Sequence, residues 1–365
     1  MKLQRLCLDE SAVLKGGAIL AIALHNYYHF LVDVHESEFD FTPERFAGFR
    51  VAVMDPHYTF QSVFAYLGHF GVELFIFLSA YGLALKYGDT PPRWAGFMWD
   101  KVKKLYPMFV VIIVIWVFLT GIPHGPAAPF GILSRFRTPL LLTVLGVSNF
   151  VPGYGLPPVG PWWFMPFIMQ FYCIWPPIVR LVNRFGRVGL CVLACTCFGL
   201  TYAANDTLVS RYNINLLMSP IGHMPELCMG IVAARYGSFP VGLSWTAIAG
   251  AVFVLGNIYQ GWWPLTFVSA LILLLNAYSL IRRMVAGNGL LRFVGSVSFP
   301  VFLVNGFTRK YFLLIAHHYS TWSVGLVMGL ANAFAAILFG VMLSRVLTPS
   351  AIPIPSWKRK RKSNV

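Results

Sequence analysis

The sequence predicts an all-α protein, a polytopic membrane helix bundle of about ten transmembrane helices with one re-entrant or interfacial segment. Composition gives the first indication, because 57% of the 365 residues are hydrophobic and only 11% are charged, whereas soluble domains carry about 25% charged residues. Apolar segments of about 20 residues, the length that crosses a bilayer, recur along the chain. The net charge of +15 therefore reflects where lysine and arginine lie around the spans, and no nucleic-acid partner is expected.

The expected spans alternate with polar connections. They are residues 12–34, 61–85, 105–122, 161–182, 188–204, 214–235, 240–258, 263–281, 292–316 and 322–347. Residues 140–150 are apolar but too few to span, and form the expected interfacial or re-entrant segment. Alternating the spans collects lysines and arginines on one side, which the positive-inside rule identifies as the cytoplasm, so both termini are cytoplasmic. Residues 1–350 would form the transmembrane domain, and residues 351–365 a basic tail that contacts anionic lipid.

The first span, residues 12–34, carries four polar side chains: Lys15, His25, Asn26 and His29. A charged side chain at the bilayer centre costs roughly 2.5 to 3.5 kcal/mol, so such groups usually face a protein interior or a wet cavity. His25 and His29 lie one helical turn apart on one face, and Lys15 lies within about 40° of that face. We expect a polar stripe that faces a cavity. The alternative is a pair of interfacial histidines at the outer end of an ordinary helix.

Two acidic residues also fall inside expected spans, Glu73 and Glu226. A buried acid in a membrane calls for a partner, and a lysine or arginine on a neighbouring helix is the natural one. Further candidate site residues inside the spans are Ser79, Trp163 and Asn305. The six cysteines show no paired C-x-x-C spacing, so the sequence predicts no metal site.

Three lysines, Lys101, Lys103 and Lys104, stand directly before the third expected span. Clustered cations at a cytoplasmic helix mouth suit a polyanionic ligand such as the phosphates of coenzyme A. The alternative is topological, with basic residues that only hold this connection on the cytoplasmic side.

Six segments in this order resemble the integral-membrane acyltransferase family 3: LKGGAILAIALHNYYH, GVELFIFLSAYGL, KVKKLYP, PWWFMPFIMQFY, MPELCMGI and VSFPVFLVNGF. The resemblance covers about residues 8–347. It implies about ten spans and the transfer of acyl groups, most often acetyl from cytoplasmic acetyl-CoA, to sugars or other acceptors at the outer face. Acetyl-CoA would be a co-substrate, with no bound cofactor.

The resemblance also implies roles for the residues of the first helix. Lys15 matches the basic residue at the start of the family's first helix, and His25 matches its essential histidine. Nine residues separate the two here instead of the usual ten. Asn26 therefore stands at the usual histidine position, and His29 is the alternative to His25 as the catalytic histidine.

Other motif positions carry over in the same way. Lys101 and Lys104 match the paired basic residues before the third helix, with Lys103 between them. Glu73 and Ser79 lie in the motif of the second helix, and Asn305 stands where a histidine is common.

The resulting hypothesis is an O-acyltransferase, with acetyl as the expected group, that acts on a carbohydrate such as a cell-surface polysaccharide or glycolipid. The expected location is a bacterial plasma membrane. The alternative is a transporter or flippase for a polysaccharide or lipid-linked sugar, whose path the same polar residues would line. Dependence on coenzyme A separates the two. A purely structural membrane subunit is a third possibility, but it has little use for so many intramembrane polar groups.

Overall fold

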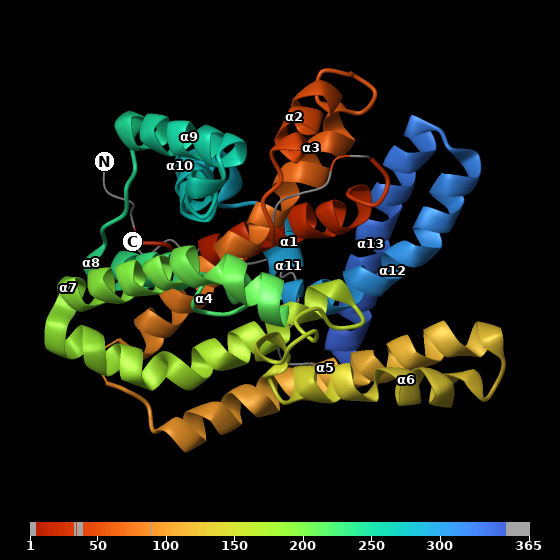
Figure 1. The fold of residues 1–365 in the computed structure, drawn as a ribbon, viewed down its shortest axis with the longest axis horizontal. Helices are drawn as coiled ribbons and strands as arrows, with labels where there is room; N and C mark the ends of the chain where they lie inside the picture. Colours follow the sequence, from red (N-terminus) through yellow and green to blue (C-terminus); the bar gives the residue numbers. More distant parts are fainter. Residues whose placement is uncertain (1–4, 33, 35–38, 89, 348–365) are drawn as a thin grey trace, which may run out of the picture.

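The computed structural model describes residues 5–32, 34, 39–88 and 90–347. Within these residues the chain consists of helices joined by turns and contains no β-strand (Figure 1). The all-α prediction is therefore confirmed. The predicted basic tail, residues 351–365, lies outside the described residues.

Thirteen α-helices are described, and short 3-10 turns connect several of them. The α-helices are α1 (Leu8–Tyr28), α2 (Pro43–Ala52), α3 (Thr59–Leu67), α4 (Gly71–Tyr87), α5 (Trp94–Gly121), α6 (Ala128–Val144), α7 (Phe164–Tyr212), α8 (Met224–Tyr236), α9 (Leu243–Ile258), α10 (Leu265–Val285), α11 (Gly289–Ser296), α12 (Ser298–Tyr319) and α13 (Trp322–Leu347). The 3-10 turns used below are η1 (Gly68–Phe70), η4 (Gly160–Trp163), η5 (Leu216–Met218) and η6 (Gln260–Trp262).

Helix α1 lies at the centre of the bundle (Figure 1). It packs against α3, α4, α11, α12 and α13. Its first turn is fixed by Glu10, whose carboxylate accepts a hydrogen bond from the Cys7 N–H at 2.9 Å and pairs with Arg282 of α10, Nη2 to Oε2 being 2.8 Å. An acid in the first turn also complements the positive end of the helix dipole. The helix ends at Tyr28, six residues before the expected end of this span.

Helix α7 corresponds to two expected spans. Gly186 has φ 58° and ψ −137°, a conformation that glycine reaches more easily than any other residue. The chain reverses there, and Figure 1 shows the two arms of α7 meeting at a sharp turn. The predicted turn between residues 182 and 188 is therefore present.

The described residues contain five helices long and apolar enough to cross a membrane, or six if α11 and α12, bent by 76°, form one broken span. The predicted count of ten is not confirmed. Helix α1 is not among these helices, because its polar residues lower its mean hydropathy. The two arms of α7 are counted as a single helix. Helices α8 and α9 have 13 and 16 residues, fewer than the about 20 of a full span.

Two boundaries differ from the prediction. Residues 140–150, expected as a short interfacial piece, are the end of α6 and the turn after it; α6 has 17 residues and packs against α5. Helix α5 begins at Trp94, so the three lysines lie around its third turn instead of in front of it. Hydropathy marks only the apolar part of a helix, and both helices continue into polar sequence.

Candidate functional site

A cavity of about 210 Å³ lies at the C-terminal end of α1. We call it the histidine cavity, because three of its polar wall residues are histidines from two different elements. Its lining residues are Ile22, His25, Asn26, His29, Phe30, Phe39, His69, Val72, Leu156, Gly160, Pro161, Trp163, Phe302 and Arg309. The predicted residues His25, Asn26, His29 and Trp163 therefore come together at one cavity.

The three histidines form a contiguous group. The rings of His25 and His29 stack with centroids 4.8 Å apart and an interplanar angle of 28°. His69, from η1, approaches the edge of His25 with centroids 5.5 Å apart. His25 and His69 are 3% and 2% exposed. Imidazoles this close, and this far from bulk water, can accept and pass protons.

His25 is held in one orientation by the backbone. Its Nδ1 lies 3.0 Å from the carbonyl oxygen of Ala65 in α3, and a carbonyl can only accept, so the neutral ring carries its proton on Nδ1. The lone pair is then on Nε2. His29 makes the corresponding contact within α1, with Nδ1 3.0 Å from the carbonyl oxygen of His25. A neutral His25 thus offers Nε2 as a base.

A glycine makes the approach of η1 to α1 possible. A Cβ atom at Gly68 would lie 2.6 Å from the carbonyl oxygen of Ala21 and 2.7 Å from Cβ of His25. Small residues at a helix crossing allow this close packing. Because His69 follows Gly68 directly, the glycine also sets the distance between His69 and His25.

An amide network joins α1 to α12 beside the histidines. Nδ2 of Asn26 donates to Oδ1 of Asn305 at 2.7 Å, and Nδ2 of Asn305 donates to the carbonyl oxygen of Phe302 at 2.7 Å. Arg309 donates from Nη1 to the carbonyl oxygen of Asn26 at 2.8 Å, and its guanidinium lies 4.1 Å from the ring centroid of Phe30. Asn305 is fully buried. The network positions a cation at the wall of the cavity.

Glu73 and Glu226 meet at His223. Nδ1 of His223 lies 3.4 Å from Oε2 of Glu73 and 3.9 Å from Oε2 of Glu226, and all three side chains are buried. The predicted lysine or arginine partner is wrong, because a histidine from the turn before α8 fills that position. Two carboxyl groups from α4 and α8 and one imidazole therefore share a single buried site.

This triad is also the group of described residues whose spacing suits a cation. One potential ligand atom from each of Glu73, His223 and Glu226 lies within 4.8 Å of the other two. The Trp163 ring lies between the triad and the histidine cavity, since it lines the cavity and faces His223 with centroids 6.5 Å apart.

The predicted lysines lie elsewhere. Lys15 is not among the described residues that line the histidine cavity. It lies toward the other end of α1, where the charge of Lys104 is close enough to repel it. Lys101 is also repelled by the charge of Lys104, and its Nζ lies 4.5 Å from the ring centroid of Tyr172. Nζ of Lys103 lies 3.2 Å from Oδ1 of Asp100. Lys15, Lys101 and Lys104 therefore form one positive region at the opposite end of α1 from the histidines.

Ser79 is half-buried in α4 and lines neither the histidine cavity nor the acidic triad, as far as the described residues show. Conversely, His69 is a cavity residue that was not among the predicted site residues. It was visible as an ionisable residue within an expected span, which is the signal that could have selected it. Phe39 lies in a connection and carried no such signal.

The chain as a whole matches one known family. Residues 8–348 match the model of a family described as an acyltransferase domain. No curated protein and no solved structure matches the chain. The match covers nearly the whole sequence, including the motifs around His25, Glu73 and Lys104, and it agrees with the family that those motifs predicted. This chain therefore belongs to acyltransferase family 3, and it is an acyltransferase with membrane-spanning helices.

Proposed function

We propose that the protein is a membrane O-acyltransferase that transfers acetyl from cytoplasmic acetyl-CoA to a hydroxyl group of a carbohydrate, in a cell-surface polysaccharide or a glycolipid. The observation that carries this proposal is that the two ends of α1 lie beside different functional groups. One end of the helix joins a positive region of three lysines, and the other end holds His25 in a cavity. A single helix thus connects a site for a polyanion with a site for a base.

The donor would bind at the lysines. The phosphates of coenzyme A carry several negative charges, and ammonium groups are suitable point charges for them. Lys101 and Lys104, with Lys15 beside them, would take the phosphates, and Lys103 would contribute from its position next to Asp100. Lys15 and His25 are ten residues apart, which corresponds to about 15 Å along a helix, a distance suited to the long pantetheine arm that carries the thioester.

His25 would act as the general base. Its Nε2 takes the proton of the acceptor hydroxyl while that oxygen attacks the carbonyl carbon of the thioester. The resulting tetrahedral oxyanion is stabilised by the Arg309 guanidinium at the cavity wall. The carbon–sulfur bond then breaks, the coenzyme A thiolate takes the proton from Nε2, and the sugar ester is released. An acyl-imidazole on the same Nε2, resolved by the acceptor, is the covalent alternative.

The membrane arrangement follows from the charges. The ten-span topology with both termini cytoplasmic places the lysine region inside and the histidine cavity toward the outer face of a bacterial plasma membrane. Counting the two arms of α7 separately and α11 with α12 as one span gives seven membrane-capable helices among the described residues, and the ten-span topology stays part of this proposal. Transfer would then proceed across the membrane, from a cytoplasmic donor to an outward-facing acceptor.

The test is mass spectrometry of surface glycans from cells with and without the gene, after labelling the acetyl-CoA pool with isotopic acetate. We expect a labelled ester that depends on the gene. If the glycans kept their modification but accumulated inside cells that lack the gene, the protein would be a carrier and not the transferase.

A further inference from the structure

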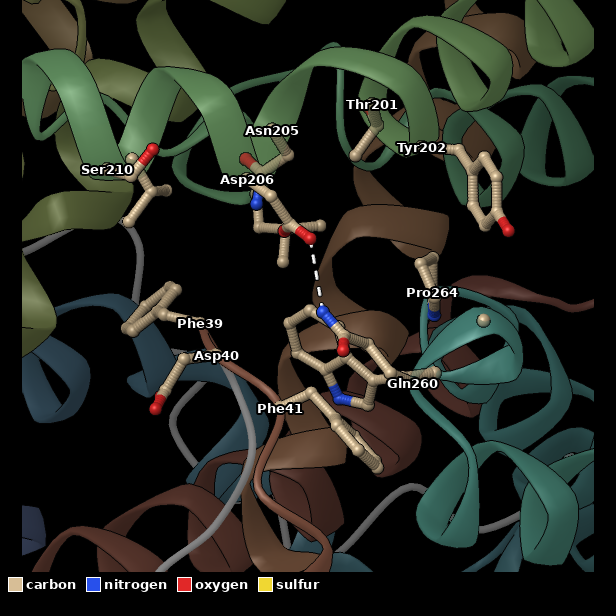
Figure 2. A pocket seen from close by; sticks show the side chains of 14 residues that line it. Phe39, Asp40, Phe41, Thr201, Tyr202, Asn205, Asp206, Ser210, Gln260 and Pro264 are labelled. Carbon is tan, nitrogen blue, oxygen red and sulfur yellow. Dashed lines mark hydrogen bonds between the residues drawn. The ribbon is translucent and has the colours of Figure 1, made fainter.

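A second and larger hollow, of about 630 Å³, lies near the histidine cavity (Figure 2). We call it the outer hollow. It is formed by the C-terminal part of α7, the connection before α2, η5 and the turn around η6. Its lining residues are Phe39, Asp40, Phe41, Thr201, Tyr202, Asn205, Asp206, Val209, Ser210, Leu217, Gln260, Gly261, Trp263 and Pro264.

The lining combines aromatic faces with hydrogen-bonding side chains. Figure 2 shows Asp206 reaching from α7 toward Gln260, whose Nε2 donates to Oδ2 of Asp206 at 3.1 Å. Phe41 and Trp263 lie beside this pair, with ring centroids 6.4 Å apart. A carboxylate accepts from hydroxyl groups, an amide both donates and accepts, and aromatic faces pack against C–H surfaces. A sugar ring presents these same features, with hydroxyls at its edge and C–H groups on its faces.

The charge of the lining decides which kind of sugar fits. Among the described residues that line the hollow, two are carboxylates, Asp40 and Asp206, and none is basic. Asp40 is neutralised by Arg45, through contacts of 2.9 Å and 2.8 Å from Nη1 and Nη2. Asp206 has the uncharged amide of Gln260 as its partner. A carboxylate or phosphate on the ligand would therefore meet net repulsion from Asp206.

The outer hollow and the histidine cavity share a wall. Phe39 lines both, and its ring touches Trp163 edge-on with centroids 5.3 Å apart. A ligand seated against Phe39 in the hollow is therefore next to the cavity that contains His25. The amide of Asn215 donates to the carbonyl oxygen of Phe39 at 2.6 Å, which fixes this wall to the turn that begins η5.

We propose that the outer hollow is the acceptor site, and that the acceptor unit it binds is an uncharged sugar, read by Asp206 and Gln260 and packed against Phe41 and Trp263. This inference rests on the proposed function. The bound sugar would extend one hydroxyl past Phe39 into the histidine cavity, where His25 takes its proton.

The experiment uses the full-length protein in detergent with [14C]acetyl-CoA and two disaccharide probes of equal size, cellobiose, which is neutral, and digalacturonate, which is anionic. The variants are Asp206→Ala, Asp206→Asn and Gln260→Ala. The matched control is Thr207→Ala, the next residue of α7, which is exposed and does not line the hollow. Acetyl-CoA binding is measured separately by calorimetry, and endogenous glycan labelling is measured in membranes.

We expect transfer to cellobiose in preference to digalacturonate. Asp206→Ala and Gln260→Ala should raise KM for cellobiose about tenfold, the effect of losing one hydrogen bond to a charged or buried group, with acetyl-CoA binding unchanged. Asp206→Asn should weaken the discrimination against digalacturonate. Thr207→Ala should behave like the wild type.

Three results would overturn the inference while leaving the proposed function standing. These are a preference for digalacturonate, wild-type KM in all the hollow variants, or labelling of endogenous glycans in membranes without transfer to cellobiose. Absence of labelled ester on any glycan, with acetyl-CoA still bound, would instead remove the proposed function and this inference with it.

Discussion

His25 and His29 stack one turn apart at the end of α1, with ring centroids 4.8 Å apart; Nδ1 of His25 is anchored to the Ala65 carbonyl of another helix, and Nδ1 of His29 contacts the carbonyl of His25 itself. The anchored ring is the better placed base. We expect His25→Ala to lower acyl transfer by about two to four orders of magnitude, the usual contribution of general base catalysis, and His29→Ala to lower it less. The measurement is ester formation per amount of protein in membranes.

His317→Ala, an exposed histidine at the end of α12, is the control and should retain wild-type activity. Intact ester formation in the His25→Ala and His29→Ala variants, singly and combined, would refute the mechanism.

The lysine region predicts an electrostatic donor site. Replacing Lys101 or Lys104 with glutamine should raise KM for acetyl-CoA about tenfold, because in the proposed donor site each replacement would remove a charge that faces the phosphates. The KM of the wild type should also rise with ionic strength, since salt screens exposed charges over about 10 Å at 0.1 M. Steady-state kinetics at two salt concentrations tests both points.

Lys310→Gln, an exposed lysine on α12 at the other end of the molecule, serves as control and should not change KM. An equal effect of Lys310→Gln would show that general surface charge, and not this region, governs donor binding.

The hydrogen bond between Asn26 and Asn305 should contribute more to the free energy of unfolding than to the rate of acyl transfer. Asn305→Ala leaves the buried amide of Asn26 without its acceptor, so the free energy of unfolding should fall by about 1–3 kcal/mol. Asn26→Ala should do the same, and the double variant should lose less than the sum of the two, because the residues interact directly. Thermal unfolding in detergent provides the comparison, and strict additivity would contradict the contact.

The acidic triad should be sensitive to loss of its histidine. His223→Ala leaves Glu73 and Glu226 facing each other without the group between them, and breaking a buried ion pair from one side costs about 3–5 kcal/mol. Little folded protein should remain by size-exclusion chromatography, whereas Glu44→Gln, on the exposed face of α2, should be neutral. A normal yield of folded His223→Ala protein would show that His223 is not needed to stabilise the two buried acidic residues.

Gly68 offers a test that leaves every polar residue in place. Gly68→Ala adds a Cβ atom within 3 Å of the α1 backbone and of His25, so η1 must move away and the spacing of His25 and His69 must change. We expect transfer to fall by about 100-fold, as small displacements of catalytic groups can cause. Gly82→Ala in α4, where a Cβ would meet nothing within 4 Å, is the matched control, and equal activity of both variants would contradict the role of Gly68.

The sequence predicted the part of the site that lies on one helix. Helical periodicity is sufficient to place His25 and His29 on one face. The expectation that intramembrane polar groups face a cavity then predicts that both line one. The same angular reasoning grouped Lys15 with them. A shared face says nothing about depth along the axis, and Lys15 lies about 15 Å away, beside Lys104.

The remainder of the site depends on contacts between segments far apart in the chain. The partner of Glu73 is His223, and the hollow is walled by Phe39, Asp206 and Gln260; no local pattern connects these positions. Helix boundaries failed for a different reason. Hydropathy follows the uninterrupted apolar run, but α5 begins at Trp94, ahead of the charged residues from Asp100 to Lys104, because backbone hydrogen bonding continues regardless of side-chain charge.

The fixed distance along helix α1 between Lys15 and His25 also bears on the choice of donor. Because an α-helix is stiff, the ten residues from Lys15 to His25 would, under the proposed function, fix the distance that a donor must span between its anionic anchor and its reactive carbonyl. A compact donor such as acetyl phosphate would then be too short to occupy both ends at once. Inserting one residue between the two positions would turn His25 by about 100° away from its partners, whereas a change of acyl group would leave the distance between anchor and base unaltered. Selection of the carrier by its length would therefore be separate from selection of the acyl group that it carries.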